Sequence, residues 1–326
     1  MTETEDLRSL QIAFAIPCYN EALAIAQVVA ECRSVVPEAR IHVMDNNSSD
    51  GTASVARAAG AQVTHVRLRG KGNVVRRMFA DLDADIYVMT DGDATYDMSE
   101  TRKLIALLVR ENLDMVVGSR VDDQQDAQTY RRGHRFGNHL LTNSVARLFG
   151  GDFTDMLSGY RIFSRRYVKS FPALATGFEI ETELTVHALE LRMPYAERPL
   201  TYRSRLQGSE SKLSTYRDGW RILRTISKLY VSERPLSFFT IMALILALAA
   251  LGLAAPLLTT WLHTGLVPRL PTAVLSVGIM LGAMLSFVSG IVLHTVTIGR
   301  QEAKRLRYLA EPGARTAWEL STPRTA

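Results

Sequence analysis

Two long apolar runs near the C-terminus restrict what this chain can fold into more than any other feature of its sequence. Residues 235–298 contain no Asp, Glu or Lys, and a single arginine, Arg269. The runs 235–261 and 271–298 within them each exceed the ~20 residues that a helix needs to cross a bilayer. Nine residues separate the two runs. The sequence therefore predicts two membrane-spanning helices after a part, residues 1–234, that has the composition of an ordinary soluble protein.

Basic residues flank the apolar region on both sides. Residues 202–234 hold eight basic and three acidic side chains, and their net charge of +5 equals that of the whole chain. Four more basic residues follow the second run: Arg300, Lys304, Arg305 and Arg307. Since basic residues remain on the cytoplasmic side, we predict a multi-pass protein of the inner (plasma) membrane with a cytoplasmic soluble domain and cytoplasmic termini. This placement favours the lipid bilayer as a partner, and no nucleic acid.

Three shorter features complete the predicted membrane part. Residues 213–234 have the spacing of a juxtamembrane amphipathic helix, which either lies on the bilayer or docks onto the soluble domain. Residues 299–326 are expected to form a basic cytoplasmic tail. Small residues recur every four positions in the second run, a pattern that favours close helix contact within the hairpin or in a homo-oligomer. They are Gly278, Gly282, Ser286 and Gly290.

The soluble part alternates strands with helices. Strands are predicted at 11–16, 41–44, 62–67 and 86–90. Each ends in polar sequence, and the sequence after the last three contains glycine. Such alternation predicts a parallel sheet with right-handed crossovers, and ligands of such sheets bind beyond the carboxyl ends of the strands. No dinucleotide fingerprint or Walker loop is present, since Gly70-Lys71-Gly72 is followed by Val75 where a third glycine would stand.

The fourth strand ends in Asp91-Gly92-Asp93, which places two carboxylates one residue apart. Side chains two positions apart in an extended segment point the same way, so Asp91 and Asp93 can converge on one point. Gly92 leaves room for a ligand to approach the backbone. Two hard oxygen ligands suit Mg²⁺ or Mn²⁺ bridged to substrate phosphates. The alternative is an Asp-Gly turn that only closes the strand.

Several further motifs accompany this pair. The first half of the chain holds Pro17-x-Tyr19-Asn20-Glu21, Asp45 with Ser48-x-Asp50-Gly51-Thr52, and the Gly70-Lys71-Gly72 turn. In this order they resemble the inverting family 2 glycosyltransferases of GT-A fold. Three later motifs resemble the polyprenyl-phosphate branch, which includes dolichol-phosphate mannose synthase and the undecaprenyl-phosphate glycosyltransferases. These are Gly118-Ser119-Arg120, Asp155-x-x-Ser158-Gly159-Tyr160-Arg161 and Gly208-Ser209-x-Ser211-Lys212-Leu213.

The resemblance covers residues 10–235 and implies an α/β catalytic domain of GT-A type, with a mostly parallel sheet, over residues 1–212. It also implies a nucleotide-sugar donor, linked to UDP or GDP. Asp45 and the loop 17–21 would hold the nucleoside, Lys71 the phosphate, and Asp91 with Asp93 the divalent cation. The full predicted donor set is Pro17, Tyr19, Asn20, Glu21, Asp45, Asp50, Lys71, Asp91 and Gly92.

Structural alternatives stay open for three of these residues. Glu21 could cap a helix N-terminus, Asp50 could form a turn and cap, and Lys71 could be a solvated turn lysine. Many members of the family continue Asp-x-Asp-x-Gln, whereas this chain has Thr95 at the Gln position. A Thr hydroxyl is a weaker and shorter ligand, so the predicted metal set is Asp91 and Asp93 alone.

The acceptor implied by the resemblance is a polyprenyl phosphate, undecaprenyl or dolichyl. A lipid monophosphate has a second pKa near ~6, so it is mostly dianionic at neutral pH and already a nucleophile. It needs positioning more than deprotonation, which favours cationic side chains. The predicted lipid-phosphate set is Arg120, Arg131, Arg205, Ser209 and Lys212, of which Arg131 is equally well a solvated surface residue.

Asp155 would face the reacting centre, and Asp93 and Arg120 complete the predicted catalytic residues. Because the acceptor is already charged, we expect Asp155 to orient and stabilise rather than to be an obligatory base. Arg161 is expected to pair with Asp155, to touch the diphosphate, or to form a structural ion pair. In the helix 178–191, a polar face is favoured over a metal site for Glu179, Glu183 and His187, and Glu181 is expected to be structural.

The predicted function is therefore transfer of a sugar to a polyprenyl phosphate by a metal-dependent, membrane-anchored hexosyltransferase. A processive polysaccharide synthase is the rival enzyme. Its Gln-x-x-Arg-Trp motif is absent, and two spans are few for a translocating channel. A catalytically inactive membrane adaptor with a nucleotide-binding fold is the non-enzymatic rival. Asp91, Asp93, Asp155 and Lys212 argue against such a loss of activity.

Overall fold

The computed structural model describes residues 7–122, 149–177, 179–203, 224, 227–228 and 230–321. Contacts divide the chain into two compact units, one of Met1–Ile222 with Lys304–Ala326 and one of Leu223–Ala303. The first unit holds the predicted catalytic domain and the second the apolar helices. The predicted basic tail, residues 299–326, is divided between them, because its residues from Lys304 onward belong to the first unit.

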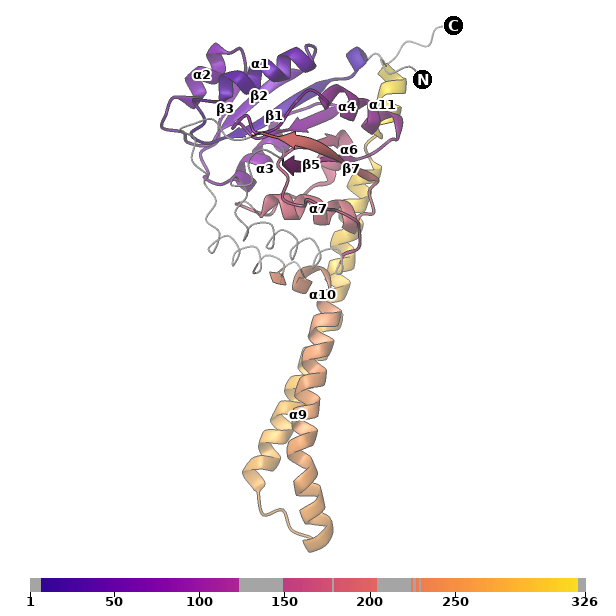
Figure 1. Ribbon diagram of the computed structural model, residues 1–326. Coiled ribbons are helices and arrows are strands. Elements are labelled where there is room, and N and C mark those ends of the chain that lie inside the picture. Colours follow the sequence, from indigo (N-terminus) through magenta and orange to yellow (C-terminus); the bar gives the residue numbers. More distant parts are fainter. Residues whose placement is uncertain are drawn as a thin grey trace. The chain divides into compact units, whose positions relative to one another are not determined.

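A seven-stranded sheet with the order β3-β2-β1-β4-β6-β5-β7 forms the centre of the first unit (Figure 1). Its first four strands are β1 (Ile12–Cys18), β2 (Arg40–Asp45), β3 (Gln62–His65) and β4 (Ile86–Met89). They pair with one another in parallel, as the alternation predicts. The helices that connect them are α1 (Ile25–Val35), α2 (Thr52–Ala58) and α3 (Lys71–Asp81). The four predicted strands are thus confirmed.

The second half of the sheet is mixed. Its strands are β5 (Met115–Asp122), β6 (Arg161–Ser164) and β7 (Tyr195–Tyr202). β6 runs antiparallel to both β4 and β5, whereas β5 and β7 pair in parallel. α4 (Thr101–Arg110) precedes β5, and α6 (Arg165–Ser170) and α7 (Ile180–Glu190) lie between β6 and β7 in the chain. The mostly parallel sheet of the GT-A fold is therefore confirmed.

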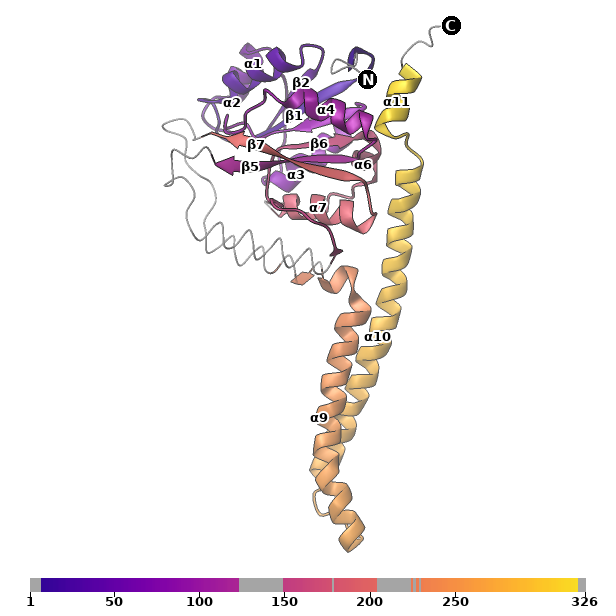
Figure 2. The ribbon, with the colours of Figure 1, turned by 45° about the vertical axis from the view of Figure 1, so that its right-hand side comes forward.

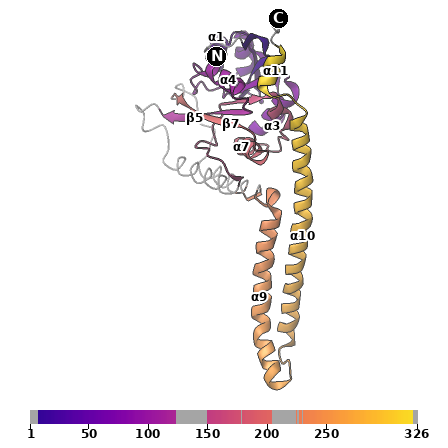
Figure 3. The ribbon, with the colours of Figure 1, turned by 90° about the vertical axis from the view of Figure 1, so that its right-hand side faces the viewer.

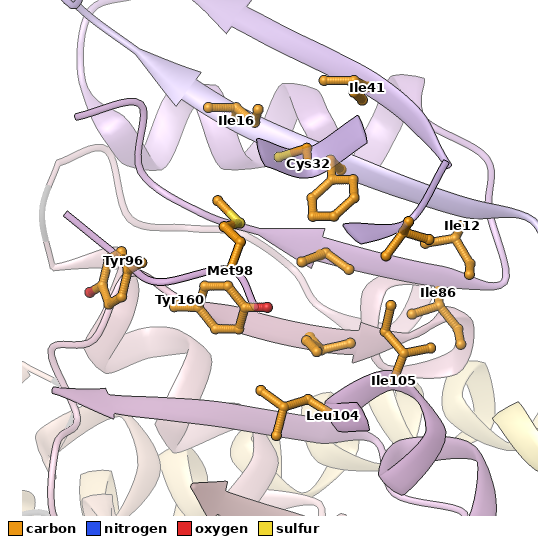
Figure 4. Close-up of a cluster of buried hydrophobic side chains, with 14 of the residues drawn as sticks. Ile12, Ile16, Cys32, Ile41, Ile86, Tyr96, Met98, Leu104, Ile105 and Tyr160 are labelled. Atoms are coloured by element: carbon orange, nitrogen blue, oxygen red, sulfur yellow. The ribbon is translucent and has the colours of Figure 1, made fainter. Parts of the chain in front are cut away.

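Helices cover both faces of this sheet. In Figure 2, α1, α2 and α4 lie on one face, and α3 and α7 lie on the other. On the first face, Ile16 of β1 and Ile105 of α4 belong to one buried apolar cluster, which Figure 4 shows. Each fully buried aliphatic side chain of this kind contributes about 1.5–3 kcal/mol. On the second face, Phe79 of α3 packs edge-on against Tyr87 and Phe163. Since both faces are filled, loops at the strand ends are left to bind ligands.

The C-terminal segment 304–321 is part of the first unit. Lys304 Nζ lies 2.7 Å from Glu190 Oε2, and the Tyr308 hydroxyl donates to Asp114 Oδ2 at 2.7 Å. Arg165 Nε donates to Glu311 Oε2 at 3.0 Å. The short helix α11 (Ala314–Ser321) then packs Trp318 against the apolar cluster. These contacts hold the C-terminal segment on the catalytic unit.

The second unit contains two long apolar helices, α9 (Pro235–Thr264) and α10 (Leu270–Leu309), which lie side by side in Figure 3. Both are long and apolar enough to cross a membrane. Many of their large side chains, such as Leu244 and Leu285, are exposed. A helix with exposed apolar side chains all round is stable only where lipid or protein covers it. The predicted pair of apolar helices is confirmed, while the predicted amphipathic helix lies mainly outside the described residues.

Small residues join α9 to α10 at a spacing of seven rather than four. Every seventh residue of α10 is buried: Ser276, Ala283, Gly290 and Thr297. Ser276 Oγ donates to the Ala250 carbonyl at 2.8 Å. Of the predicted four-residue pattern, Ser286 and Gly290 face α9, because Ser286 donates to the Phe239 carbonyl and a Cβ at Gly290 would lie 2.8 Å from Phe239. A Cβ at Gly278 or Gly282 would meet nothing within 4 Å.

Candidate active site

The predicted polar loops meet at one edge of the sheet. β2, β1 and β4 are neighbours in the sheet and run in parallel, so their carboxyl ends lie together. Cys18 pairs with Asp45 at that edge, and Asp91 follows β4. The loops that begin at Pro17, Asp45 and Asp91 therefore come from three adjacent strand ends, as expected for a ligand site in such a sheet.

Hydrogen bonds join the loop after β1 to the loop after β2. Asn20 donates its backbone N–H to Ser48 Oγ at 2.9 Å, and its side chain accepts the Ser49 N–H at 2.8 Å. Asn20 has φ 54°, a left-handed conformation that Asn tolerates. Glu21 donates its N–H to Thr52 Oγ1 at 2.8 Å. The two loops form a single surface, from which the Tyr19 side chain is exposed.

Asp50 stabilises the same contact between the loops after β1 and β2. Its carboxylate accepts the Ala22 N–H at 3.0 Å, the Thr52 N–H at 3.0 Å and the Thr52 hydroxyl at 2.5 Å. Partial burial acts to raise the pKa of Asp50, but these hydrogen bonds hold it below its usual value. The contacts are those of the turn-and-cap alternative, so Asp50 shapes the loop. The Glu21 carbonyl accepts the N–H groups of Ala24 and Ile25, each at 3.0 Å, just before and at the start of α1.

Asp45 is buried at the end of β2 with one oxygen available to a ligand. Its Oδ2 lies 3.3 Å from His65 Nδ1, whereas its Oδ1 has no hydrogen-bond partner among the described residues. A buried carboxylate oxygen without a donor is costly, and a base N–H or ribose hydroxyl would satisfy it. Asn46, which the sequence analysis missed, accepts the Gly70 N–H at 2.7 Å and so fixes the turn before Lys71.

Lys71, the first residue of α3, lies between two carboxylates. Its Nζ is 2.7 Å from Asp91 Oδ1 and 2.6 Å from Glu181 Oε1. Burial alone would lower the pKa of Lys71, but the two carboxylates raise it well above its usual range. The side chain is 12 % exposed, so Lys71 is not a solvated turn lysine. Glu181 of α7 was expected to be structural, and no local pattern indicates that a residue so distant in the chain reaches Lys71.

Two glycines allow close approach around Asp91. A Cβ at Gly92 would lie 2.5 Å from Cys18 Sγ. A Cβ at Gly159 would overlap the Asp91 carboxylate, so the loop that contains Gly159 lies directly against Asp91. Tyr96, buried nearby, accepts the Gly159 N–H on its hydroxyl at 2.9 Å, and burial raises its pKa above the usual range.

Asp93 is buried and oriented by Thr95. The Thr95 hydroxyl donates to Asp93 Oδ1 at 2.6 Å, and the Thr95 N–H donates to the same oxygen at 3.3 Å. Thr95 therefore acts on the carboxylate rather than replacing the family's Gln as a ligand. The hydroxyl of Tyr202, whose pKa burial raises, also bonds to Thr95. This hydrogen bonding fixes the direction in which Asp93 presents its charge.

The donor set around Asp91 and Asp93 fits a divalent cation shared with a substrate. Both ligands are carboxylates, and each is held by a neighbour, Lys71 or Thr95. Among the described residues, no group of three or more His, Cys, Asp and Glu side chains could hold a metal ion alone. A magnesium-like ion is usually held by one or two carboxylates together with phosphate oxygens and water. The residues thus fit a cation that binds with the donor diphosphate.

Arg120 and Asp155 form a bidentate ion pair. Arg120 Nε donates to Asp155 Oδ2 and Arg120 Nη2 to Oδ1, each at 2.7 Å. The Arg120 backbone N–H adds a third contact at 3.2 Å. Glu197 of β7 accepts the Asp155 N–H at 2.9 Å and the Thr154 hydroxyl at 2.5 Å, so it fixes the loop from the other side. The sequence motifs predict Arg120 and Asp155 at one site, whereas no motif indicates Glu197.

Arg161 does not pair with Asp155. It is fully buried and donates to the carbonyls of Ser158 (3.1 Å) and Met156 (2.6 Å) and to Thr185 Oγ1 (2.9 Å). Burial lowers the pKa of Arg161. The expected pairing of Arg161 with Asp155 is therefore wrong. Arg120, on the neighbouring strand β5, binds the Asp155 carboxylate instead. Arg161 supports the backbone of the loop between Asp155 and β6.

The remaining polar residues of α7 have structural contacts. Glu183 accepts the N–H groups of Leu174 and Ala175, and Glu179, just before α7, accepts those of Thr176 and Gly177. His187 is buried against Ser170. The favoured prediction of a polar helix face agrees with these contacts. Four predicted acceptor residues lie outside the described residues: Arg131, Arg205, Ser209 and Lys212.

Comparison with known proteins assigns the chain to a family. The glycosyl transferase family 2 model matches residues 13–171. Glycosyltransferase AglJ of Haloferax volcanii is 31% identical over 91% of this chain and 98% of its own length. The protein belongs to glycosyltransferase family 2. Glycosyltransferase activity is accordingly supported for the chain.

Two other relatives of this family 2 glycosyltransferase are named for polyprenyl phosphates. The dolichyl-phosphate hexose transferase of Haloferax volcanii is 29% identical, over 68% of this chain and 95% of its own. The undecaprenyl-phosphate 4-deoxy-4-formamido-L-arabinose transferase of Proteus mirabilis is 24% identical over 78% of each chain. The predicted resemblance to the polyprenyl-phosphate branch is therefore confirmed.

Solved structures agree on the fold of this family 2 glycosyltransferase. Glucosyl-3-phosphoglycerate synthase of Mycobacterium tuberculosis, in complex with Mn²⁺, UDP-glucose and glycerol 3-phosphate, matches with a TM-score of 0.53 and 24% identity. The match covers 68% of this chain and 81% of that one. Mannosyl-3-phosphoglycerate synthase of Rubrobacter xylanophilus matches with a TM-score of 0.55 and 20% identity, over 69% of this chain and 77% of that one.

Proposed function

We propose that this enzyme transfers a sugar from a UDP- or GDP-linked donor to a membrane-bound polyprenyl phosphate, with Mg²⁺ or Mn²⁺ at Asp91 and Asp93. The observation that carries this proposal is the gathering of three fixed carboxylates, Asp45, Asp91 and Asp93, at adjacent strand ends of a chain that also has two membrane-length helices. The names of its dolichyl-phosphate and undecaprenyl-phosphate relatives support the acceptor.

The donor would lie along the edge formed by β2, β1 and β4. Asp45, with one unpartnered buried oxygen, would accept a hydrogen bond from the nucleoside. Asp91 and Asp93 would hold the diphosphate through the cation, which when bound stabilises negative charge on the leaving group as a Lewis acid. Because Thr95 fixes the carboxylate of Asp93, this ligand would need little reorganisation to bind the cation.

The acceptor step needs no base in principle. An oxygen of the lipid phosphate attacks the anomeric carbon, the bond from that carbon to the diphosphate oxygen breaks, and the nucleoside diphosphate leaves. The nucleophile carries its negative charge before the reaction, so no proton has to be removed. Arg120 would attract the phosphate, and its bidentate contact holds Asp155 beside the reacting centre in an orienting role.

Membrane attachment suits this acceptor. A polyprenyl phosphate presents its reactive group only at the headgroup level of a bilayer. A catalytic domain tethered by α9 and α10 would meet that group at a high effective concentration. The solved phosphoglycerate synthases share the fold, and one is in complex with a small phosphate, glycerol 3-phosphate, so a lipid and a small phosphate have to be compared directly as acceptors.

The test uses the full-length protein in lipid nanodiscs with radiolabelled UDP- and GDP-sugars. Acceptors are undecaprenyl phosphate, dolichyl phosphate and soluble 3-phosphoglycerate, and label is followed into the lipid or the aqueous phase. We expect label in the lipid phase with one donor, loss of transfer on chelation, and at least a hundredfold loss in Asp91→Ala with Asp93→Ala. Full activity of this double variant with all divalent ions chelated would overturn the proposal.

The other outcomes identify the rivals. Transfer to 3-phosphoglycerate alone would assign a soluble acceptor. Growth of a long polymer would assign a processive synthase. Absence of both transfer and donor hydrolysis with every nucleotide-sugar would support the inactive adaptor. Each of these three results contradicts polyprenyl-phosphate transfer.

A further inference from the structure

The buried carboxylate of Glu181 touches Lys71 and lies one contact away from the predicted metal ligands. Its side chain is 5% exposed, with Oε1 2.6 Å from Lys71 Nζ, and that same Nζ lies 2.7 Å from Asp91 Oδ1. Glu181 Oε2 is buried without a hydrogen-bond partner among the described residues. Burying a carboxylate costs free energy unless the carboxylate is paired. The contact with Lys71 therefore explains how the negative charge of Glu181 is tolerated in a buried position.

The position of Glu181 changes how strongly Lys71 acts on Asp91. An ammonium group at hydrogen-bond distance competes with a metal ion for the same carboxylate, and burial strengthens that competition. Glu181 gives Lys71 a second anionic partner, so Asp91 does not hold this cation alone. The second Glu181 oxygen offers Lys71 a further acceptor on α7 when another cation reaches Asp91.

We propose that Glu181 is a positioning residue that draws Lys71 away from Asp91 and thereby keeps Asp91 available as a metal ligand. This inference rests on the proposed metal-dependent transfer and goes beyond it. It assigns to α7, a helix outside the motifs at the ends of β1, β2 and β4, control over the affinity of the site for its cation. Groups that orient metal ligands typically change metal affinity about 10- to 100-fold when they are removed.

The test measures Mn²⁺ binding to the full-length protein in nanodiscs by electron paramagnetic resonance, with Mn²⁺ alone and with Mn²⁺ plus UDP. In Glu181→Gln, the neutral amide attracts the Lys71 ammonium less than the carboxylate does, so Lys71 interacts mainly with Asp91. The Mn²⁺ dissociation constant should therefore rise about 10- to 100-fold. Glu183→Gln is the matched control on the same helix, since Glu183 contacts the N–H groups of Leu174 and Ala175. Its Mn²⁺ affinity should stay within about twofold of the native protein.

A double-mutant cycle separates positioning from a general structural role. In the Lys71→Met background there is no ammonium to draw away, so adding Glu181→Gln should leave Mn²⁺ affinity unchanged. An equal loss in both backgrounds would overturn the inference. If Glu181→Gln does not fold, as judged by circular dichroism, Glu181→Asp takes its place. The shorter carboxylate should give an intermediate affinity, and a native affinity there would also overturn the inference.

Failure of the inference and failure of the proposed function give different results. If the native protein binds Mn²⁺ and Glu181→Gln binds it equally well, only the role of Glu181 is contradicted. If the native protein binds no Mn²⁺ with or without UDP, the metal role of Asp91 is contradicted, and the role of Glu181 with it.

Discussion

Thr95 would serve the proposed metal site without being a ligand. Its hydroxyl donates to Asp93 Oδ1 at 2.6 Å and its N–H to the same oxygen at 3.3 Å. Both donors fix the carboxylate in one orientation, which lowers the entropy cost of binding a cation. The residue that many relatives have here, Gln, is long enough to reach a cation itself, whereas Thr is not.

Thr95→Val removes this hydroxyl and keeps the shape of the side chain. We expect the Mn²⁺ concentration for half-maximal transfer to rise about tenfold, because Asp93 loses its orienting donor. Thr95→Ser should restore most of the difference. The control is Thr90→Val at the end of β4, where the buried hydroxyl has no hydrogen-bond partner among the described residues, and no change in Mn²⁺ requirement is expected. Equal effects of the two Val substitutions would contradict this role of Thr95.

Among single residues, the sequence identified only those that belong to local motifs. Asp91 and Asp93 were singled out because two carboxylates one residue apart at a strand end form a local pattern that the sequence displays. Glu197 was missed, and Glu181 was expected only to be structural, because their contacts with the Asp155 loop and with Lys71 join segments far apart in the chain. Arg161 was misassigned for the same reason, since pairing in the sheet decides which arginine reaches Asp155.

The C-terminal helices are the elements that composition describes least well. The run of basic residues after the second apolar run predicts a basic cytoplasmic tail. Three residues of that segment instead find partners on the catalytic unit: Lys304 with Glu190, Tyr308 with Asp114, and Glu311 with Arg165. Asp114 is fully buried, so Tyr308, together with Arg166 and Ser164, compensates a charge that could not stand alone.

Tyr308→Phe should therefore destabilise the catalytic unit by about 1.5–3 kcal/mol, the usual contribution of a hydrogen bond to a charged group. The ring stays in place over Arg166, whose guanidinium carbon lies 4.8 Å from the ring centroid. Chemical unfolding followed by tryptophan fluorescence measures the change, since Trp318 of α11 packs on the same unit. Arg307→Gln, at an exposed position one residue earlier, should change stability by less than about 0.5 kcal/mol. Identical curves for native protein and Tyr308→Phe would contradict the docking role.

The strands and the apolar helices were predictable from sequence for a physical reason. Short apolar runs that end in polar sequence, and long uninterrupted apolar runs, are local signals, and each appears within a few residues of its element. The contact spacing of seven along α10 was not predictable, because small residues occur on more than one of its faces. Only the partner helix decides which face is buried, so Gly278 and Gly282 stand outside the seam while Gly290 lies in it.

At the scale of the whole molecule, the distribution of charge predicts how the chain crosses the membrane. Basic residues precede α9 and recur near the end of α10, whereas the connection between the helices, residues 265–269, holds one arginine. Positive residues remain in the cytoplasm, so the connection should lie outside and the catalytic unit inside. This predicted orientation would place the active site on the cytoplasmic side.

Cysteine labelling in intact cells tests this orientation. The native cysteines are buried, and burial raises the pKa of the Cys32 thiol, so the native protein should react little. Val267→Cys, at an exposed site between the helices, should react with a membrane-impermeant maleimide from outside. Glu100→Cys, before α4 in the catalytic unit, should react only after the membrane is opened. The reverse pattern would place the active site outside, where no nucleotide-sugar is supplied. That result would contradict both the orientation and the donor proposed for this enzyme.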